Sequence, residues 1–188
     1  MTERHEIRLC GYGGQGVVLA GHIIGQAASI FEHKHATFIQ DYGPEARGGA
    51  TRADIVVFDK RVLYPYIKTP TVLVAMSQAA YDKYHPQNRG DALVIIDSGL
   101  IHPAKMRGKK LLTVPARQIA EELGRVAVAN SVMLGFFTAA TNIISVVAMK
   151  KAITAAVPKN TGELNIKAFD RGYTYAQEHL DSSFISNN

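Results

Sequence analysis

The sequence predicts an α/β domain with a mixed, mostly parallel sheet and helices on both of its faces. Two observations support this prediction. Short apolar runs typical of buried strands recur along the chain and alternate with segments of helical periodicity. A glycine-rich loop also separates the first strand from the first helix. Such an order buries a sheet between two helical layers, so we expect one three-layer domain over residues 1–180 and a flexible polar tail at 181–188.

The first half of the chain is expected to supply a strand, a helix and an antiparallel pair. Glu6–Cys10 and Ala36–Gln40 have the character of strands, and Gln15–Phe31 between them has helical spacing. Thr51–Phe58 is rich in β-branched residues, and a short apolar segment, Arg61–Tyr64, follows after two residues. This spacing predicts a hairpin, although Asp-Lys is not a favoured two-residue turn.

The second half is expected to continue the sheet and then become helical. The expected strands are Thr71–Met76, Ala92–Asp97 and Leu111–Val114. The expected helices are Ala116–Leu123, Asn130–Val157 with Pro158 as its stop, and Asn165–Leu180. Val126–Met149 lacks charge over a length that could span a bilayer, but six polar residues interrupt it. We therefore expect one or two deeply buried helices, in the core or under a partner subunit, and no membrane association.

Composition excludes several functional classes. The 188 residues carry a net charge of +5, with 47% hydrophobic and 20% charged residues, as in ordinary globular proteins. The basic residues are scattered, so we expect no nucleic-acid partner. The one cysteine, Cys10, lies in an apolar run and is expected to be a buried hydrophobe, since an iron–sulfur cluster is normally held by four thiolates. The charged N-terminus is unlike a secretory signal, so we expect a cytoplasmic protein.

The glycine loop, Gly11–Gly16, fits the pattern G-x-G-x-x-G between a strand and a helix. Gly11 is expected to permit a tight turn, and Gly13 and Gly14 to let a phosphate approach the backbone. Gly16 would let the helix pack closely on the strand, and the helix N-terminus would offer N–H donors to an anion.

Three uses of the glycine loop remain open at this stage. It could bind a phosphate-bearing ligand such as coenzyme A, bind a nicotinamide or flavin dinucleotide, or serve only packing or a subunit contact. A dinucleotide site needs an acidic residue about 20 positions further on. Asp41, about 25 residues after Gly16, is the nearest candidate and could equally belong to the next loop.

A second loop has an unusual composition, Tyr42-Gly43-Pro44-Glu45-Ala46-Arg47-Gly48-Gly49. Gly-Pro fixes a turn, and the glycine pair frees the backbone just beyond it. Arg47, held between these constraints, suits recognition of a carboxylate or phosphate. A structural pair of Glu45 with Arg47 is the alternative. No nucleophile elbow, P-loop or metal-like spacing accompanies the two loops, so no catalytic residue and no metal ligand is predicted.

Together the two loops resemble those of the gamma subunits of 2-oxoacid:ferredoxin oxidoreductases. Later features agree: Tyr64-Pro65, Asn130 before Leu134-Gly135, and Asn165 with Ala168, Phe169 and Gly172. The resemblance covers nearly the whole chain. The Glu45–Gly49 form of the second loop is more similar to the 2-oxoglutarate type than to the pyruvate type, although Asp41 replaces the small hydroxyl residue of many relatives.

This resemblance implies a Rossmann-like fold and a role in oxidative decarboxylation of a 2-oxoacid, with coenzyme A as acyl acceptor and ferredoxin as electron acceptor. Thiamine diphosphate, magnesium and iron–sulfur clusters are then expected in sister subunits, with none tightly bound here. The implied partners are alpha and beta subunits and a ferredoxin-like delta subunit, with a homodimer when the chain is alone. The isolated chain is expected to be inactive.

The implied site residues divide into two groups. Gly11, Gly13, Gly14, Gln15, Gly16 and Arg47 are expected to place coenzyme A or its phosphate and to help close the active site. Contacts within the second loop or to a partner are expected from Tyr42, Pro44, Glu45, Gly48, Gly49 and Asn130. Two alternatives stand beside this interpretation: an independent dinucleotide oxidoreductase, and an assembly module that binds no small molecule.

Overall fold

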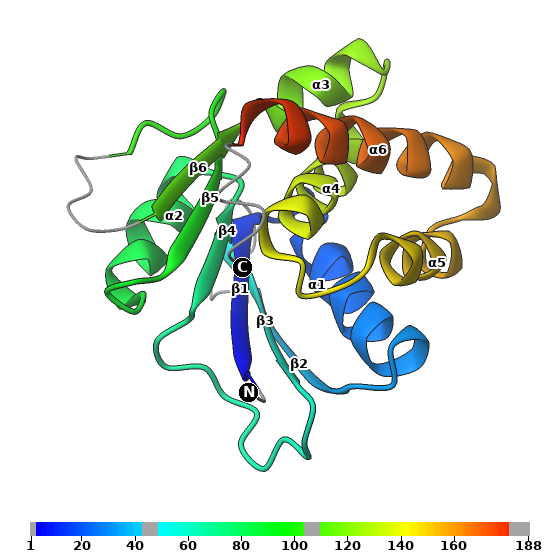
Figure 1. Ribbon diagram of the computed structural model, residues 1–188. Coiled ribbons are helices and arrows are strands. Elements are labelled where there is room, and N and C mark those ends of the chain that lie inside the picture. The colour runs from blue at the N-terminus through cyan, green and yellow to red at the C-terminus, as the bar shows by residue number, and fades with distance from the viewer. Residues whose placement is uncertain (1–2, 43–48, 104–109, 181–188) are drawn as a thin grey trace.

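The computed structural model describes residues 3–42, 49–103 and 110–180, and its core is a six-stranded sheet (Figure 1). The strand order across the sheet is β2-β3-β1-β4-β5-β6. The strands are β1 (His5–Tyr12), β2 (His35–Asp41), β3 (Ala50–Phe58), β4 (Val72–Ala75), β5 (Leu93–Asp97) and β6 (Lys110–Val114).

The sheet is mixed because β3 runs against both of its neighbours. The pairs β1–β4, β4–β5 and β5–β6 are parallel, whereas β3 is antiparallel to β1 and to β2. Five strands therefore point the same way, and β3 alone runs in reverse. The predicted mixed, mostly parallel sheet is confirmed.

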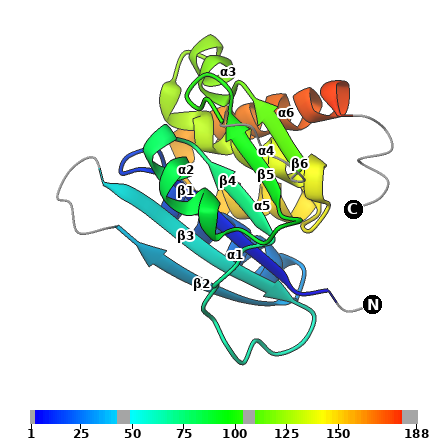
Figure 2. The same cartoon turned by 90° about the vertical axis from the view of Figure 1, so that its left-hand side faces the viewer.

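Helices cover both faces of the sheet, as predicted (Figure 2). The face toward the viewer in Figure 2 carries α2 (Gln78–Tyr84), and the other helices lie behind the sheet. These are α1 (Val17–Gln26), which continues as a π-helical turn, η1 (Ala27–Phe31), then α3 (Ala116–Glu122), α4 (Ala129–Thr141), α5 (Val146–Ala156) and α6 (Gly162–His179). Short 3-10 turns complete the fold: η2 (His85–Gln87), η3 (Val126–Val128) and η4 (Lys159–Thr161).

The alternation of side chains along β1 shows how the two faces differ. Ile7 and Leu9 enter the larger hydrophobic core beneath α1 and α4. Cys10 points the other way, into a smaller core beneath α2, where burial raises the pKa of its thiol far above the usual range. Cys10 is thus the buried hydrophobe that its apolar run predicts. Arg8 shares that face, and its guanidinium is paired with Asp54 of β3 at 2.7 Å.

The predicted hairpin partner of Thr51–Phe58 is wrong. The structure places no strand at Arg61–Tyr64, and β3 forms its antiparallel pair with β2 instead. Both hydrogen-bonding edges of β3 are occupied, by β1 and β2, so a further strand has no edge on which to pair. The unfavourable Asp-Lys turn agrees with this outcome. Residues 59–71 form an irregular connection to β4 instead.

The long uncharged segment forms two helices, separated where Asn142 adopts a left-handed conformation with φ of 51°. All thirteen residues of α4 are buried, and its neighbours are helices of the same chain. The burial therefore comes from α1, α3, α5 and α6 and from the large core that α4 shares with the sheet, so of the two expected alternatives the core is the one observed. None of the helices in the described ranges has the length and hydrophobicity needed to cross a bilayer.

Candidate functional site

The glycine loop lies at the carboxyl ends of β1 and β4, where the chain changes sides of the sheet. The helix after β1, α1, packs behind the sheet, whereas the helix after β4, α2, packs in front of it (Figure 2). In open α/β sheets, ligands bind in the crevice that forms at such a switch point. The two strand ends are also joined directly, because the Met76 backbone N–H donates to the Cys10 carbonyl at 2.8 Å.

Gln15 fixes the conformation of the glycine loop. Its Oε1 accepts a hydrogen bond from the Tyr12 backbone N–H at 2.6 Å, and its Nε2 donates to the Met76 carbonyl at 2.7 Å. Gly11 makes room for this side chain, because a Cβ there would lie 2.6 Å from Gln15 Oε1. The predicted turn at Gly11 is therefore wrong: Gly11 is a paired residue of β1, opposite Thr51.

The left-handed positions of the loop are Gly14, with φ of 96°, and Gly16, with φ of 72°. Gly16 is the N-cap of α1, and Asn130 Nδ2 donates to its carbonyl oxygen at 3.3 Å. A Cβ on Gly16 would collide with the Asn130 side chain, so its role is to accept this amide rather than to pack helix on strand. Asn130 was predicted as a loop or interface residue, and it lies beside the glycine loop.

The first turn of α1 offers backbone N–H groups to an anion. No side chain of the described residues caps this terminus, and the turn contains no acidic residue. The first N–H groups of a helix have no partner within the helix and carry a partial positive charge. Gly13 and Gly14, next to this terminus, are exposed. An anion can therefore approach the backbone here.

A cavity of about 280 Å³ adjoins the glycine loop. Its lining joins the loop, the ends of β4 and β5, and the start of α3 and α4: Gly14, Gln15, Met76, Asp97, Leu100, Arg117, Val126, Ala127 and Ala129. This combination of an apolar lining with a few convergent polar groups is typical of small-molecule sites. No local signal in the sequence identifies Met76, Leu100 or Arg117 as residues of a site.

Asp97 ties two walls of the cavity together. One carboxylate oxygen accepts the Gly99 backbone N–H at 3.0 Å, and the other accepts the Arg117 backbone N–H at 2.9 Å. Burial raises the pKa of Asp97 despite these hydrogen bonds. The Arg117 side chain is half exposed and lies against Glu121, with Nε 2.8 Å from Oε1. Because such an exposed pair is weak, this guanidinium is available to a bound anion.

The second loop is only partly described. Gly43–Gly48, including Pro44, Glu45, Arg47 and Gly48, lies outside the described residues, so those predictions stay predictions. Tyr42 is 57% exposed, and Gly49 is buried next to the start of β3. Because β3 lies between β2 and β1, Asp41 at the end of β2 is about two strand spacings, roughly 10 Å, from β1. Asp41 pairs with Arg52 at 3.4 Å, which disfavours a ribose-binding role.

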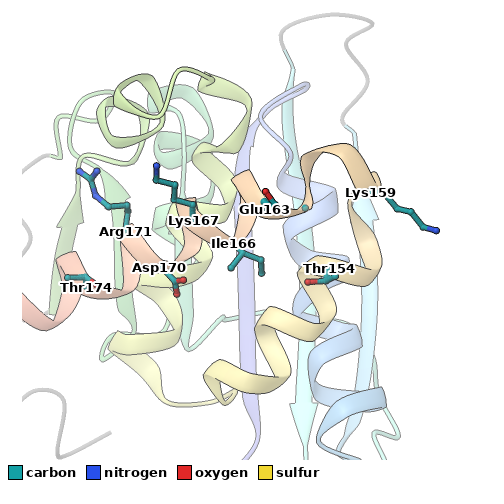
Figure 3. Close-up of a pocket in the computed structure, with 9 residues that line it drawn as sticks. Thr154, Lys159, Glu163, Ile166, Lys167, Asp170, Arg171 and Thr174 are labelled. Atoms are coloured by element: carbon teal, nitrogen blue, oxygen red, sulfur yellow. The ribbon is translucent and has the colours of Figure 1, made fainter.

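A groove with a larger volume, about 610 Å³, lies along α6 from Gly162 to Thr174 and reaches Thr154 of α5 (Figure 3). Figure 3 shows that Lys159 points away from Ile166, so the groove's side chains do not converge. Asp170 and Arg171 are already paired, with Lys150 at 2.6 Å and Glu122 at 2.9 Å. The groove is thus a shallow surface between helices, and the cavity at the glycine loop is the better candidate site.

Residues 6–175 match the family model described as "Pyruvate ferredoxin/flavodoxin oxidoreductase". The chain belongs to this family. It is 45% identical over 178 residues to the 2-oxoglutarate synthase subunit KorC of Methanocaldococcus jannaschii, with 93% of this chain and 95% of that protein covered. The predicted family is confirmed, and the chain is a gamma-type subunit of a 2-oxoacid:ferredoxin oxidoreductase complex.

Two solved structures of oxidoreductases share the family fold. The gamma subunit of a keto/oxoacid ferredoxin oxidoreductase from Geobacter sulfurreducens is 36% identical, with a TM-score of 0.82 over 93% of this chain and 99% of that one. The 2-oxoglutarate:ferredoxin oxidoreductase of Magnetococcus marinus, with 2-oxoglutarate, coenzyme A and succinyl-CoA bound, has a TM-score of 0.87 at 22% identity. This chain matches 32% of that larger protein, and at this identity the match shows the fold alone.

Proposed function

We propose that the chain serves a 2-oxoglutarate:ferredoxin oxidoreductase and places coenzyme A at the glycine-loop cavity. The reaction would convert 2-oxoglutarate and coenzyme A into succinyl-CoA and CO₂, with electrons passed to ferredoxin. The observation that carries the proposal is that three features lie together at the switch point of the sheet. These are the N-terminus of α1, which no described side chain caps, the exposed Gly13 and Gly14, and the cavity. The similarity to a 2-oxoglutarate synthase subunit supports the substrate.

Each group around the cavity has a distinct role in this proposal. The N–H groups at the start of α1 would hold a phosphate of coenzyme A, and Arg117 would add a positive charge at the opposite wall. Gln15 would keep the loop in shape by bridging Tyr12 and Met76. Because Gly13 and Gly14 are exposed, a sister subunit would complete the site and close it over the ligand.

The carbon and electron chemistry would take place in sister subunits. Thiamine diphosphate with magnesium would supply the decarboxylation step, and iron–sulfur clusters would carry the electrons. Two observations support this: the one thiol of the sequence, Cys10, is buried, and the described residues include no cluster of three potential metal ligands. The chain's own contribution is binding and positioning.

The proposal is tested with the assembled complex carrying Arg117→Ala. We expect the KM for coenzyme A to rise roughly five- to tenfold, the loss of one partly exposed charge-assisted contact, with little change in kcat. Arg171→Ala is the matched control, since Arg171 is equally exposed and paired but lies on α6. An unchanged KM in Arg117→Ala would refute coenzyme A placement by this cavity. Faster turnover of pyruvate or a branched-chain 2-oxoacid would refute the substrate assignment.

A further inference from the structure

The connection between β3 and β4 exposes three large apolar side chains on one short segment. In this segment, residues 60–68, here named the aromatic loop, Leu63 is 84%, Tyr64 52% and Tyr66 59% exposed. The rings of Tyr64 and Tyr66 lie 5.6 Å apart, so the exposed groups form one patch. Clustered exposed apolar residues on a soluble domain mark interaction sites, whereas scattered ones need no explanation.

The backbone of the aromatic loop accepts hydrogen bonds from Arg4, just before β1, and from Arg8 of β1. Arg4 Nη2 donates to the Tyr64 carbonyl at 3.0 Å, and Arg8 Nη2 donates to the Ile67 carbonyl at 3.2 Å. Arg8 is itself fixed by two hydrogen bonds to the Asp54 carboxylate, 2.7 and 2.8 Å long. Ile67 is buried, although its neighbours Tyr66 and Lys68 are exposed. The aromatic side chains are therefore presented outward on an ordered backbone, which lowers the entropy lost on docking.

Three basic residues lie in the same segment as this apolar patch. Lys60, Arg61 and Lys68 are exposed, and no ion pair among the described residues involves them. An apolar centre with aromatic residues and a charged rim is the usual anatomy of a protein–protein interface. The complementary surface would offer an apolar recess for the tyrosines and carboxylates around it.

We propose that the aromatic loop docks a different subunit of the oxidoreductase complex, one with an acidic rim around an apolar recess. This proposal rests on the family membership of the chain and not on coenzyme A binding. A second copy of this chain fits less well. A two-fold contact between copies brings the same patch onto itself, so Lys60, Arg61 and Lys68 would face their own equivalents.

The position of the aromatic loop separates docking from the cavity. The end of β3 and the start of β4 lie beside the start of β1, at one end of the central strands. The glycine loop follows the end of β1, at the other end of these strands. Figures 1 and 2 show the connection projecting near the N-terminus, at the opposite end of the sheet from α3. A subunit bound there leaves the cavity accessible.

The test measures binding of this chain, immobilised and intact, to the purified remaining subunits of its complex. We expect Tyr64→Ala/Tyr66→Ala to raise the Kd roughly tenfold or more, as loss of two aromatic anchors would. Ile30→Ala/Val147→Ala is the matched control, because those side chains are 54% and 64% exposed but lie on other elements. Lys60→Gln/Arg61→Gln/Lys68→Gln should flatten the salt dependence of the Kd. Unchanged thermal unfolding would show that each variant is folded.

Three results would overturn the proposal. The first is an unchanged Kd for the remaining subunits in the folded tyrosine variant. The second is an equal rise of this Kd in the control variant. The third is a tyrosine variant that loses self-association of the isolated chain but binds the remaining subunits as before. The KM for coenzyme A, measured with all subunits at saturating concentration, should be unchanged in the tyrosine variant. Failure of the docking proposal is therefore distinguishable from failure of the cavity proposal, which is tested through Arg117.

Discussion

Asn130 and Gly16 fit each other only as a pair. Asn130 Nδ2 donates to the Gly16 carbonyl at 3.3 Å, and the missing side chain of Gly16 leaves the space that the amide fills. Gly16 also has a φ of 72°, which glycine adopts without strain. The contact joins the N-cap of α1 to α4 and so sets the glycine loop against the cavity wall at Ala129.

Gly16→Ala should lower the free energy of unfolding by roughly 1–3 kcal/mol, because the new methyl group meets the Asn130 amide in a left-handed conformation. Adding Asn130→Ala should restore part of this loss, since it removes the overlap but not the backbone strain. Urea unfolding of both single variants and the double variant measures the coupling. Strictly additive losses would contradict the steric pairing.

The crossing of α4 and α6 depends on two other glycines. A Cβ on Gly135 would overlap the Phe169 carbonyl, and one on Gly172 would overlap the Val132 carbonyl. Because backbone atoms cannot move aside as a flexible side chain can, Gly135→Ala should destabilise the protein by roughly 1–3 kcal/mol or more. Gly162→Ala, in the same helix pair but in open space, should be neutral or stabilising by up to about 1 kcal/mol. Thermal unfolding distinguishes the two, and equal effects would refute the close approach.

Replacing only one partner of the buried ion pair Arg8–Asp54 should strongly lower the free energy of unfolding. Their side chains are 1% and 5% exposed, so Arg8→Met would leave the buried Asp54 carboxylate with only a long contact, 4.0 Å, to Arg52 Nε. The expected loss is about 3–5 kcal/mol of unfolding free energy, measured with guanidinium chloride. The double variant Arg8→Met/Asp54→Leu should lose less unfolding free energy than Arg8→Met alone, because it removes both charges of the pair. If the double variant loses as much unfolding free energy as Arg8→Met and Asp54→Leu lose together when measured separately, packing and not charge dominates the contribution of the pair.

Glu32 should contribute to the stability lost in acid. Burial alone raises its pKa, but hydrogen bonds from Lys34 and Ser145 outweigh burial, and the net pKa lies below the ordinary value of a glutamate. A carboxyl group with a lowered folded-state pKa stabilises the protein above its unfolded pKa, and this contribution is lost as the pH falls through the folded value. Wild type should therefore lose more stability between about pH 5 and pH 3 than Glu32→Gln. Unfolding free energies across this range check the sign, and parallel curves would contradict it.

Local signals predicted much of the fold because they need no knowledge of distant partners. The apolar runs at Glu6–Cys10 and Ala92–Asp97 are buried strands, and Pro158 follows the end of α5 as expected. One local signal was missed: Ser77 caps α2 by accepting the Ala80 backbone N–H at 3.4 Å, and Ser followed by a short amphipathic run could have revealed that helix. The start of α6 at Gly162 precedes the expected Asn165 by three residues, because the ends of a helix carry a weaker sequence signal than its periodic middle.

By itself, the sequence determined the class of the fold, the glycine loop before α1 and the family, since these depend on residue order and short-range spacing. Only the tertiary structure decided which strand pairs with β3, because an antiparallel partner is chosen by free edges and not by the nearest apolar run. It also decided that α4 is covered by its own chain, and that Asp97 and Arg117 stand beside Gln15 at one cavity. These residues come from separate strands and helices, and nothing in local spacing brings them together.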